Sequence, residues 1–271
     1  MITGDGLLAH HRLRSGAGVP LVLLHGFPLD SRMWLDVVDL LPGEPDVIAL
    51  DLPGMGESPT GSDVAATLGA PDEPSIDVSG DAVAATLRAL GVDRAVVAGL
   101  SMGGYVVMSL LARHPELVAG AALLDTKAGE DPQAARDNRL RIADELESQH
   151  DVEPVLSMRR SLLGQTSREQ REDLVERLEA WIRDQGPAGV AWCQRAMAPR
   201  PDRLDAIAAF DGPLLVVVGE EDELSPLDEA QKMVDAAKDA ELVVVPRAGH
   251  MTTIEAPEPV ASSLAALMRR V

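Results

Sequence analysis

Cysteine, aromatic residues and positive charge are all scarce in this chain of 271 residues. Cys193 is the single cysteine, so an intrachain disulfide is excluded. Phe, Trp and Tyr make up only 2% of the residues, while 46% are hydrophobic, so the core must be built from aliphatic side chains. The 24 Lys and Arg residues face 44 Asp and Glu residues, and the net charge of −20 argues against binding to the phosphates of nucleic acid or to anionic lipid.

Long hydrophobic runs and cofactor motifs are missing as well. No apolar stretch approaches the roughly 20 residues that a membrane-spanning helix requires. Residues 1–5 show no basic region followed by an apolar core, so we expect no signal peptide and a soluble, cytoplasmic protein. His and Cys residues form no zinc-binding pattern, and no G-x-G-x-x-G follows the first apolar run. The sequence therefore predicts no metal site and no cofactor.

The chain does contain a regular alternation of short aliphatic runs and amphipathic segments. The runs predict buried strands, and the segments with helical spacing predict helices. Strands are expected at 19–24, 47–50, 95–98, 118–124, 213–219 and 242–245, with helices at 31–41, 77–90, 102–113, 228–237 and 259–270. This order is typical of an α/β fold with a doubly wound, mostly parallel sheet covered on both faces. Residues 10–11 are expected in an N-terminal tail, and 60–74 in an irregular connection.

The alternation stops between residues 130 and 209. This stretch has no convincing strand, but charged helical segments occur at 134–149, 153–163, 167–185 and 189–197, separated by prolines. The strand pattern then resumes. We therefore expect a helical lid at 130–209, inserted into a core formed by residues 1–129 and 210–271. Trp181 is expected to pack within this lid rather than to line a pocket.

The pentapeptide Gly99-Leu100-Ser101-Met102-Gly103 joins a predicted strand to a predicted helix. A serine at the apex of such a strand–turn–helix unit is the pattern of a nucleophile elbow, in which the flanking glycines permit a very tight turn. A glycine-rich turn without catalytic function would have the same residues, so further groups are required. A serine hydroxyl is a weak nucleophile unless a base lies beside it, usually a histidine oriented by a carboxylate.

A carboxylate and a histidine follow the two last predicted strands. Asp222 comes just after the strand at 213–219, and His250 comes after the strand at 242–245. Because ligands of open α/β sheets bind at the carboxyl ends of the strands, we expect both side chains beside Ser101. Asp125, at the end of another strand, is an alternative partner for the histidine, and Asp222 lies in an acidic run that would also suit a solvated turn.

An acyl-transfer site also needs two hydrogen-bond donors for a developing oxyanion. The backbone N–H of Met102, at the start of the elbow helix, is one candidate. The other is the N–H of Phe27, in the loop that follows the first predicted strand. Trp34 and Tyr105 flank these motifs and are candidates for the substrate pocket, although Tyr105 fits the core equally well.

Together these motifs resemble those of the α/β-hydrolase superfamily. The resemblance rests on His25-Gly26-Phe27-Pro28-Leu29 with Trp34, on Asp51-Leu52-Pro53-Gly54-Met55-Gly56-Glu57-Ser58, on the elbow, on Gly219 with Asp222 and Pro226, and on Gly249-His250. It fades in the lid. The nearest likeness is to small-substrate carboxylesterases, enol-lactonases and cofactor-free haloperoxidase-like hydrolases. The likeness implies an α/β-hydrolase fold, Ser101, Asp222 and His250 as nucleophile, acid and base, and a structural role for Asp51.

The sequence therefore predicts a serine hydrolase that cleaves a small-molecule ester or lactone through an acyl-enzyme on Ser101. Dehalogenases of the superfamily carry aspartate at the elbow apex, so halide displacement is disfavoured. One alternative is a C–C bond hydrolase or lyase that uses the same residues on an acidic substrate, with Arg32 or Arg159 as the cation. Another is a ligand-binding protein without catalytic activity. No nucleic-acid or membrane partner is expected, and no oligomeric state is predicted.

Overall fold

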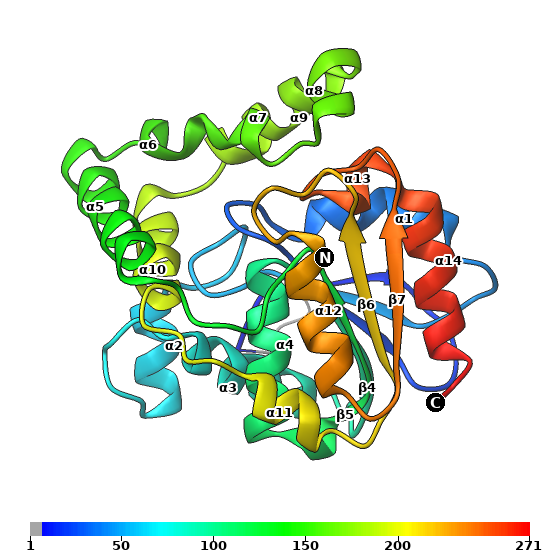
Figure 1. The fold of residues 1–271 in the computed structure, drawn as a ribbon. Coiled ribbons are helices and arrows are strands. Elements are labelled where there is room, and N and C mark those ends of the chain that lie inside the picture. Colours follow the sequence, from blue (N-terminus) through cyan, green and yellow to red (C-terminus); the bar gives the residue numbers. More distant parts are fainter. Residues whose placement is uncertain (1–6) are drawn as a thin grey trace.

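A seven-stranded sheet forms the centre of the computed structural model, which describes residues 7–271 (Figure 1). Residues 1–6, which include the segment considered for a signal peptide, lie outside the described part. The strand order is β1-β3-β2-β4-β5-β6-β7, and only the β1–β3 pair is antiparallel. The strands are β1 (His10–Arg14), β2 (Leu21–Leu24), β3 (Val47–Leu50), β4 (Ala95–Leu100), β5 (Val118–Leu124), β6 (Leu214–Gly219) and β7 (Ala240–Val245).

The central strands are continuous aliphatic runs because a parallel sheet with helices on both sides is buried on both faces. Every residue of β2, β4, β5 and β6 is buried. Leu100 of β4 pairs with Leu124 of β5, and Gly219 of β6 pairs with Val245 of β7, so the carboxyl ends of these strands meet at one edge. The loops that carry the predicted site residues start from this edge.

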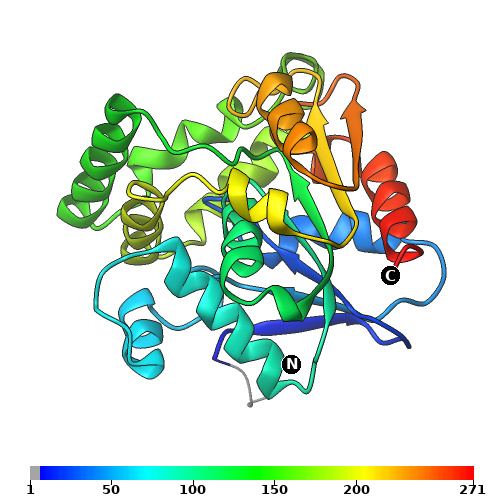
Figure 2. The ribbon, with the colours of Figure 1, turned by 60° about the horizontal axis from the view of Figure 1, so that its bottom comes forward.

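Helices cover the two faces of the sheet (Figures 1 and 2). On one face α1 packs against α14, and on the other α3 packs against α4, with α12 lying over β6 and β7. These helices are α1 (Leu35–Leu40), α3 (Ile76–Ala89), α4 (Met102–Arg113), α12 (Leu227–Ala236) and α14 (Pro257–Met268), and the 3-10 helix η1 (Ser31–Trp34) precedes α1. The arrangement confirms the predicted doubly wound α/β fold.

A helical insert separates β5 from β6. It consists of α5 (Gln133–Gln149), α6 (Glu153–Leu156), α7 (Met158–Ser161), α8 (Gln165–Gln170), α9 (Glu172–Arg183), α10 (Pro187–Met197) and α11 (Leu204–Ala209). The helices α5 and α10 pack side by side, while α11 packs against α4 and α12 of the core (Figure 1). The part of the insert that stands over the edge of the sheet is therefore α5–α10. Its predicted boundaries as a separate domain, 130–209, remain a prediction.

Two expectations for the N-terminal third of the chain are wrong. The stretch 60–74 is not irregular, because it contains α2 (Gly61–Leu68). The Thr60 hydroxyl accepts the N–H of Asp63 at the start of this helix, and Gly69 ends it with a φ of 66°. These are ordinary start and stop signals of a helix. In addition, His10 and His11 do not lie in a tail, because they form the start of the edge strand β1.

Candidate active site

Ser101 lies at the apex of a strained turn between β4 and α4. Its φ of 53° and ψ of −110° place a non-glycine residue outside the favoured regions, a strain that is typical of functional sites. The turn is closed so tightly that a Cβ on Gly99 would lie 2.2 Å from the carbonyl oxygen of Gly103. A Cβ on Gly103 would lie 2.3 Å from the carbonyl oxygen of Leu24. Both glycines are therefore required by the close approach of backbone to backbone.

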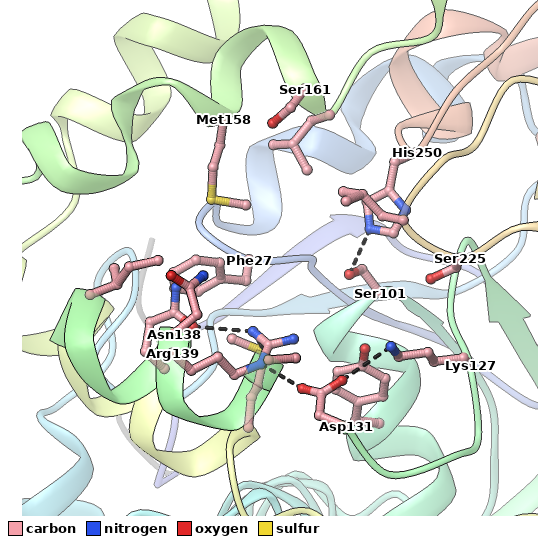
Figure 3. A pocket seen from close by; sticks show the side chains of 17 residues that line it. Phe27, Ser101, Lys127, Asp131, Asn138, Arg139, Met158, Ser161, Ser225 and His250 are labelled. Carbon is pink, nitrogen blue, oxygen red and sulfur yellow. Dashed lines mark hydrogen bonds and ion pairs between the residues drawn. The ribbon is translucent and has the colours of Figure 1, made fainter. Parts of the chain in front are cut away.

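A chain of two short hydrogen bonds links Ser101 to His250 and His250 to Asp222 (Figure 3 shows the first). The Oγ of Ser101 lies 2.8 Å from Nε2 of His250, and Nδ1 of His250 lies 2.8 Å from Oδ2 of Asp222. An ionised carboxylate can only accept, so Nδ1 carries the proton and the Nε2 lone pair faces the serine hydroxyl. This is the geometry that a general base for Ser101 requires.

Asp222 is itself held in position by its own loop. Its Oδ1 accepts the backbone N–H groups of Leu224 and Ser225, at 2.8 Å and 3.0 Å, which leaves Oδ2 for the histidine. Burial disfavours the charged imidazole, but the hydrogen bond and the charge of Asp222 outweigh this effect and raise the pKa of His250 above its ordinary value of 6.5. His250 therefore becomes protonated at a higher pH than a free histidine does, and once protonated it can no longer act as a base.

Asp125, the alternative acid, lies close to this chain but makes no hydrogen bond to it. Its Oδ2 accepts the hydroxyl and the N–H of Thr252, at 2.6 Å and 3.0 Å, and its Oδ1 accepts the N–H of Gly219 at 3.0 Å. It is completely buried. Burial, together with the charge of Asp222, raises the pKa of Asp125 to about 7. The geometry thus places Asp222, and not Asp125, against the imidazole.

Two backbone amides face the site without a partner. Within residues 7–271, neither the N–H of Phe27 nor the N–H of Met102 donates a hydrogen bond. Met102 is the first residue of α4, where N–H groups have no acceptor inside the helix and the helix dipole favours negative charge. Both amides therefore lack a protein acceptor, and their role in binding an oxyanion remains a prediction.

A cavity of about 340 Å³ opens beside Ser101 and His250 (Figure 3). Tyr105 lines it, as expected, and Phe27 lines it as well. Trp34 does not: it is fully buried in the core, because η1 turns its side chain toward the aliphatic interior rather than toward the site. The insert supplies most of the remaining wall. Its lining residues, besides Asp131, are Ala135, Asn138, Arg139, Ile142, Met158, Ser161, Leu162, Gln194 and Met197.

The charged side chains of the cavity were not found from the sequence. Lys127, Asp131 and Arg139 line it, whereas Arg32 and Arg159, the cations considered above, do not. Arg32 pairs with Asp30 and Asp184, and Arg159 pairs with Glu179, away from the cavity. Lys127 follows β5, and Arg139 lies on α5, so a useful signal would have been their position next to a strand end and on the first helix after it.

The insert is joined to the loop of His250 by a compact set of hydrogen bonds. The N–H of His250 donates to the carbonyl of Leu162 at 3.0 Å. The carboxylate of Glu255, at the end of α13 (Thr252–Glu255), accepts the N–H groups of Gly164 and Gly249, each at 2.9 Å. It also accepts the N–H of Met251 at 3.1 Å. The backbone on both sides of the histidine is thus bound by the same carboxylate that binds the insert.

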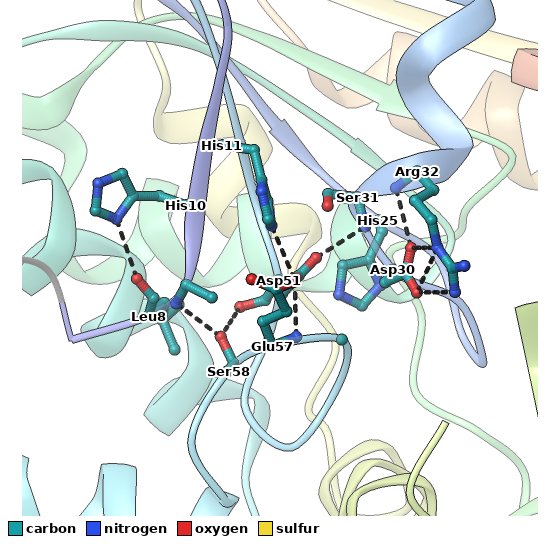
Figure 4. A network of polar contacts seen from close by, with 12 residues as sticks. Leu8, His10, His11, His25, Asp30, Ser31, Arg32, Asp51, Glu57 and Ser58 are labelled. Carbon is teal, nitrogen blue, oxygen red and sulfur yellow. Dashed lines mark hydrogen bonds and ion pairs between the residues drawn. The ribbon is translucent and has the colours of Figure 1, made fainter. Parts of the chain in front are cut away.

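A second polar network braces the opposite side of the edge (Figure 4). The buried carboxylate of Asp51 accepts the N–H of Ser31 at 2.9 Å and the N–H of Glu57 at 3.0 Å, and it lies 3.1 Å from Nε2 of His11. Nε2 of His25 accepts the N–H of Leu52 at 2.8 Å, so this ring positions the loop and is not free to act as a base. Asp51 therefore has the structural contacts that the family resemblance implies.

No group of three or more His, Cys, Asp or Glu side chains within residues 7–271 is arranged to hold a metal ion. No helix in this part of the chain is long and apolar enough to cross a membrane.

Comparison with known proteins agrees with the fold. The family model described as "alpha/beta hydrolase fold" matches residues 19–257. The chain belongs to the α/β-hydrolase fold family. Within that family, this hydrolase-fold protein is similar to the thermophilic esterase of Thermogutta terrifontis, solved with malate bound. The two share 32% identity and a TM-score of 0.87, over 97% of this chain and 93% of that chain.

Two curated proteins also match over most of the chain. The chain is 33% identical to the dihydrolipoyllysine-residue acetyltransferase component of the acetoin cleaving system of Pseudomonas putida, over 98% of this chain and 68% of that protein. It is 28% identical to the (E)-2-((N-methylformamido)methylene)succinate hydrolase of Acinetobacter baylyi, over 94% of this chain and 92% of that protein. The predicted resemblance to α/β-hydrolases is therefore confirmed.

Proposed function

We propose that the protein is a serine hydrolase that cleaves a small carboxylic ester or lactone through an acyl-enzyme on Ser101. The observation that carries the proposal is the pair of 2.8 Å hydrogen bonds that connect Ser101 through His250 to Asp222. A serine in this arrangement has an adjacent base, and the base has a partner that fixes its tautomer.

In the acylation step, Nε2 of His250 takes the proton from Oγ of Ser101 as Oγ attacks the carbonyl carbon. The oxyanion that forms accepts the N–H groups of Phe27 and Met102. Asp222 stabilises the imidazolium that results. When the tetrahedral intermediate collapses, the C–O bond to the leaving group breaks, and His250 returns its proton to the departing alkoxide.

In the deacylation step, His250 takes a proton from water, and the hydroxide attacks the acyl carbon. The oxyanion again rests on the amides of Phe27 and Met102. His250 then protonates Oγ of Ser101 as the carboxylic acid leaves. The same nitrogen therefore serves as base and acid in each half of the reaction.

The relatives support hydrolysis of this kind. The similar solved structure described above is named as an esterase, and one curated relative is named as a hydrolase. A second candidate is C–C bond hydrolysis of an acidic substrate with the same serine and histidine. The observation that favours it is the presence of Lys127 and Arg139 in the cavity wall.

The first experiment uses a fluorophosphonate probe, which reacts only with an activated serine. We expect one adduct per chain by intact mass, absent in Ser101→Ala, and hydrolysis of short 4-nitrophenyl esters or lactones that the substitution abolishes. Labelling without ester or lactone turnover would favour the C–C candidate. If the folded wild-type protein gives neither an adduct nor turnover, the hydrolase proposal fails and a ligand-binding role takes its place.

A further inference from the structure

The wall of the cavity below Ser101 is positively charged, although the whole chain has a net charge of −20. The cavity is lined by two cations, Lys127 and Arg139, and by one carboxylate, Asp131. The carboxylate is shared with a third cation, Arg200, which lies behind Tyr105 with its guanidinium carbon 4.1 Å from the ring centre. One carboxylate cannot neutralise three cations, so this cluster keeps a positive excess.

Asp131 is already saturated by these contacts. Its Oδ2 accepts Nε of Arg139 at 2.7 Å and Nη1 of Arg200 at 2.6 Å. Its Oδ1 accepts Nη2 of Arg200 at 2.9 Å and lies 3.1 Å from Nζ of Lys127. Burial opposes ionisation of this carboxyl, but the hydrogen bonds and charges of the two arginines outweigh burial and lower the pKa of Asp131. Asp131 therefore stays charged and acts as the fixed centre of the cluster.

The two lining cations retain unused donors. Within residues 7–271, Arg139 uses Nε for Asp131 and Nη1 for Gln194 at 3.1 Å, with a longer contact to the sulfur of Met197, while its Nη2 donates to no protein group. Lys127 has three N–H donors and one ion pair. Both side chains are 22% exposed, and Figure 3 shows them on either side of Asp131, across the cavity from Met158 and Ser161.

From this geometry we propose that the substrate carries a carboxylate besides the scissile group, and that Arg139 and Lys127 bind this carboxylate while the scissile carbonyl lies at Ser101. Three cations around Asp131 leave two positive charges, and a substrate carboxylate bound by Arg139 and Lys127 would offset part of this excess. The planar guanidinium offers the donors that match carboxylate oxygens. This inference rests on the proposed function only for what happens at Ser101; the anion site itself does not depend on turnover.

The competing explanation is that Lys127 and Arg139 serve only to neutralise Asp131. Arg200 alone would do so, since it is 97% buried and makes two hydrogen bonds to that carboxylate. Lys127 and Arg139 would then have no electrostatic partner, although each side chain is only 22% exposed. A charge placed in such surroundings is costly unless another group pairs with it.

The test uses the Ser101→Ala protein, which lacks the hydroxyl that would attack an ester and so cannot consume it by the proposed mechanism. Its affinity for monomethyl adipate is compared by calorimetry with that for dimethyl adipate, which has the same chain but no charge. We expect the monoester to bind about tenfold to a hundredfold more tightly, as charged hydrogen bonds do. Adding Arg139→Gln or Lys127→Gln should remove most of this preference. Arg141→Gln, which removes a charge from the solvent side of the same helix, should leave it intact.

The outcomes separate the two proposals. Equal binding of the two esters, or a preference that survives both cavity substitutions in folded protein, overturns the anion site. If the preference is lost with Arg139→Gln but wild-type protein hydrolyses neither ester nor lactone, the anion site stands and the proposed hydrolase function fails. Because Arg139→Gln could disturb the packing around Asp131, Arg139→Lys and the thermal unfolding of each variant are measured in parallel. Lysine keeps the positive charge but lacks the planar pair of N–H donors of arginine. We therefore expect Arg139→Lys to show an intermediate preference for the monoester.

Discussion

Asp125 and Asp131 lie close together in the chain and are both almost completely buried near the same cavity, yet their surroundings are opposite. Asp125 receives hydrogen bonds only from neutral groups, and it faces a second carboxylate, Asp222. Asp131 is contacted by three cations. The pKa of Asp125 is accordingly raised to about 7, whereas that of Asp131 is lowered.

The difference shows that burial alone does not decide the charge of a carboxyl group. Burial raises the pKa of both groups, and only the cations around Asp131 reverse the effect. Asp125 therefore lies among neutral donors beside a second carboxylate, while Asp131 is held as a negative charge by the cations around it.

The largest expected effect is a loss of activity that differs between substitutions of Asp222 and Asp125. Asp222→Asn should lower kcat/KM for an ester by about 10⁴-fold, because the imidazole loses the acceptor that fixes its tautomer. Asp125→Asn should lower kcat/KM far less, since Asp125 makes no hydrogen bond to His250. Both are measured by steady-state kinetics on folded protein. A greater loss with Asp125→Asn would reverse the assignment of the acid.

The next effect concerns stability. Asp131→Asn removes the partner of the buried Arg200 and should lower the free energy of unfolding by about 3–5 kcal/mol. Asp125→Asn should cost about 1–3 kcal/mol, because an amide nitrogen would face the N–H of Gly219 or Thr252. Urea unfolding gives both values. Asp211→Asn, at an exposed pair with Lys238, is the control and should produce no measurable change; equal losses for Asp125 and Asp131 would contradict the contrast.

A smaller effect is expected in the pH dependence of activity. Since the pKa of His250 is raised, kcat/KM should fall toward acid with a midpoint above 6.5. The charge of Asp125 contributes to this increase, so Asp125→Asn should move the midpoint to lower pH. Asp211→Asn should leave it in place. A midpoint that moves upward in Asp125→Asn would show that Asp125 acts on the site in some other way than through its charge.

The smallest effect is the slope of stability against pH, and its sign differs for the two acids. An ionised, paired Asp131 stabilises the fold above the unfolded-state pKa of about 4, and this contribution is lost as the pH falls through the lower folded-state pKa. Asp125 binds its proton more tightly when folded, so its contribution decreases as the pH rises from about 4 to about 7. Asp131→Asn should therefore flatten the acid limb, and Asp125→Asn the limb between pH 4 and 7, in urea unfolding at a series of pH values.

The fold and the reacting groups were largely accessible from the sequence because their signals are local. Aliphatic runs mark the buried strands, and Ser101, Asp222 and His250 each lie in the loop or turn that follows one of them. The two glycines that flank Ser101 predict a tight turn, because a side chain at either position would collide with the backbone. These signals depend on residues that are neighbours in the chain, so no knowledge of tertiary contacts is needed.

The charged wall of the cavity could not be predicted in the same way. Asp131, Arg139 and Arg200 come from separate segments, and each resembles the solvated charges around it, such as Arg136 and Arg141 on α5. Only the packing of α5 against α10 decides which arginine faces inward.

The prediction that Trp34 lines the substrate pocket was wrong for a related reason. Proximity to a site motif in sequence does not reveal which face of η1 it occupies, and the structure turns it into the core.

The contacts of Glu255 have a consequence for engineering and for divergence of this scaffold. The carboxylate holds Gly164 of the insert and the residues on both sides of His250 at once, and a Cβ on Gly249 would lie 2.1 Å from the nitrogen of Gly164. The insert is thus not an independent module that can be exchanged at will. A transplanted cap that does not retain the 162–166 backbone path would lose the hydrogen bonds that connect the insert to the histidine loop.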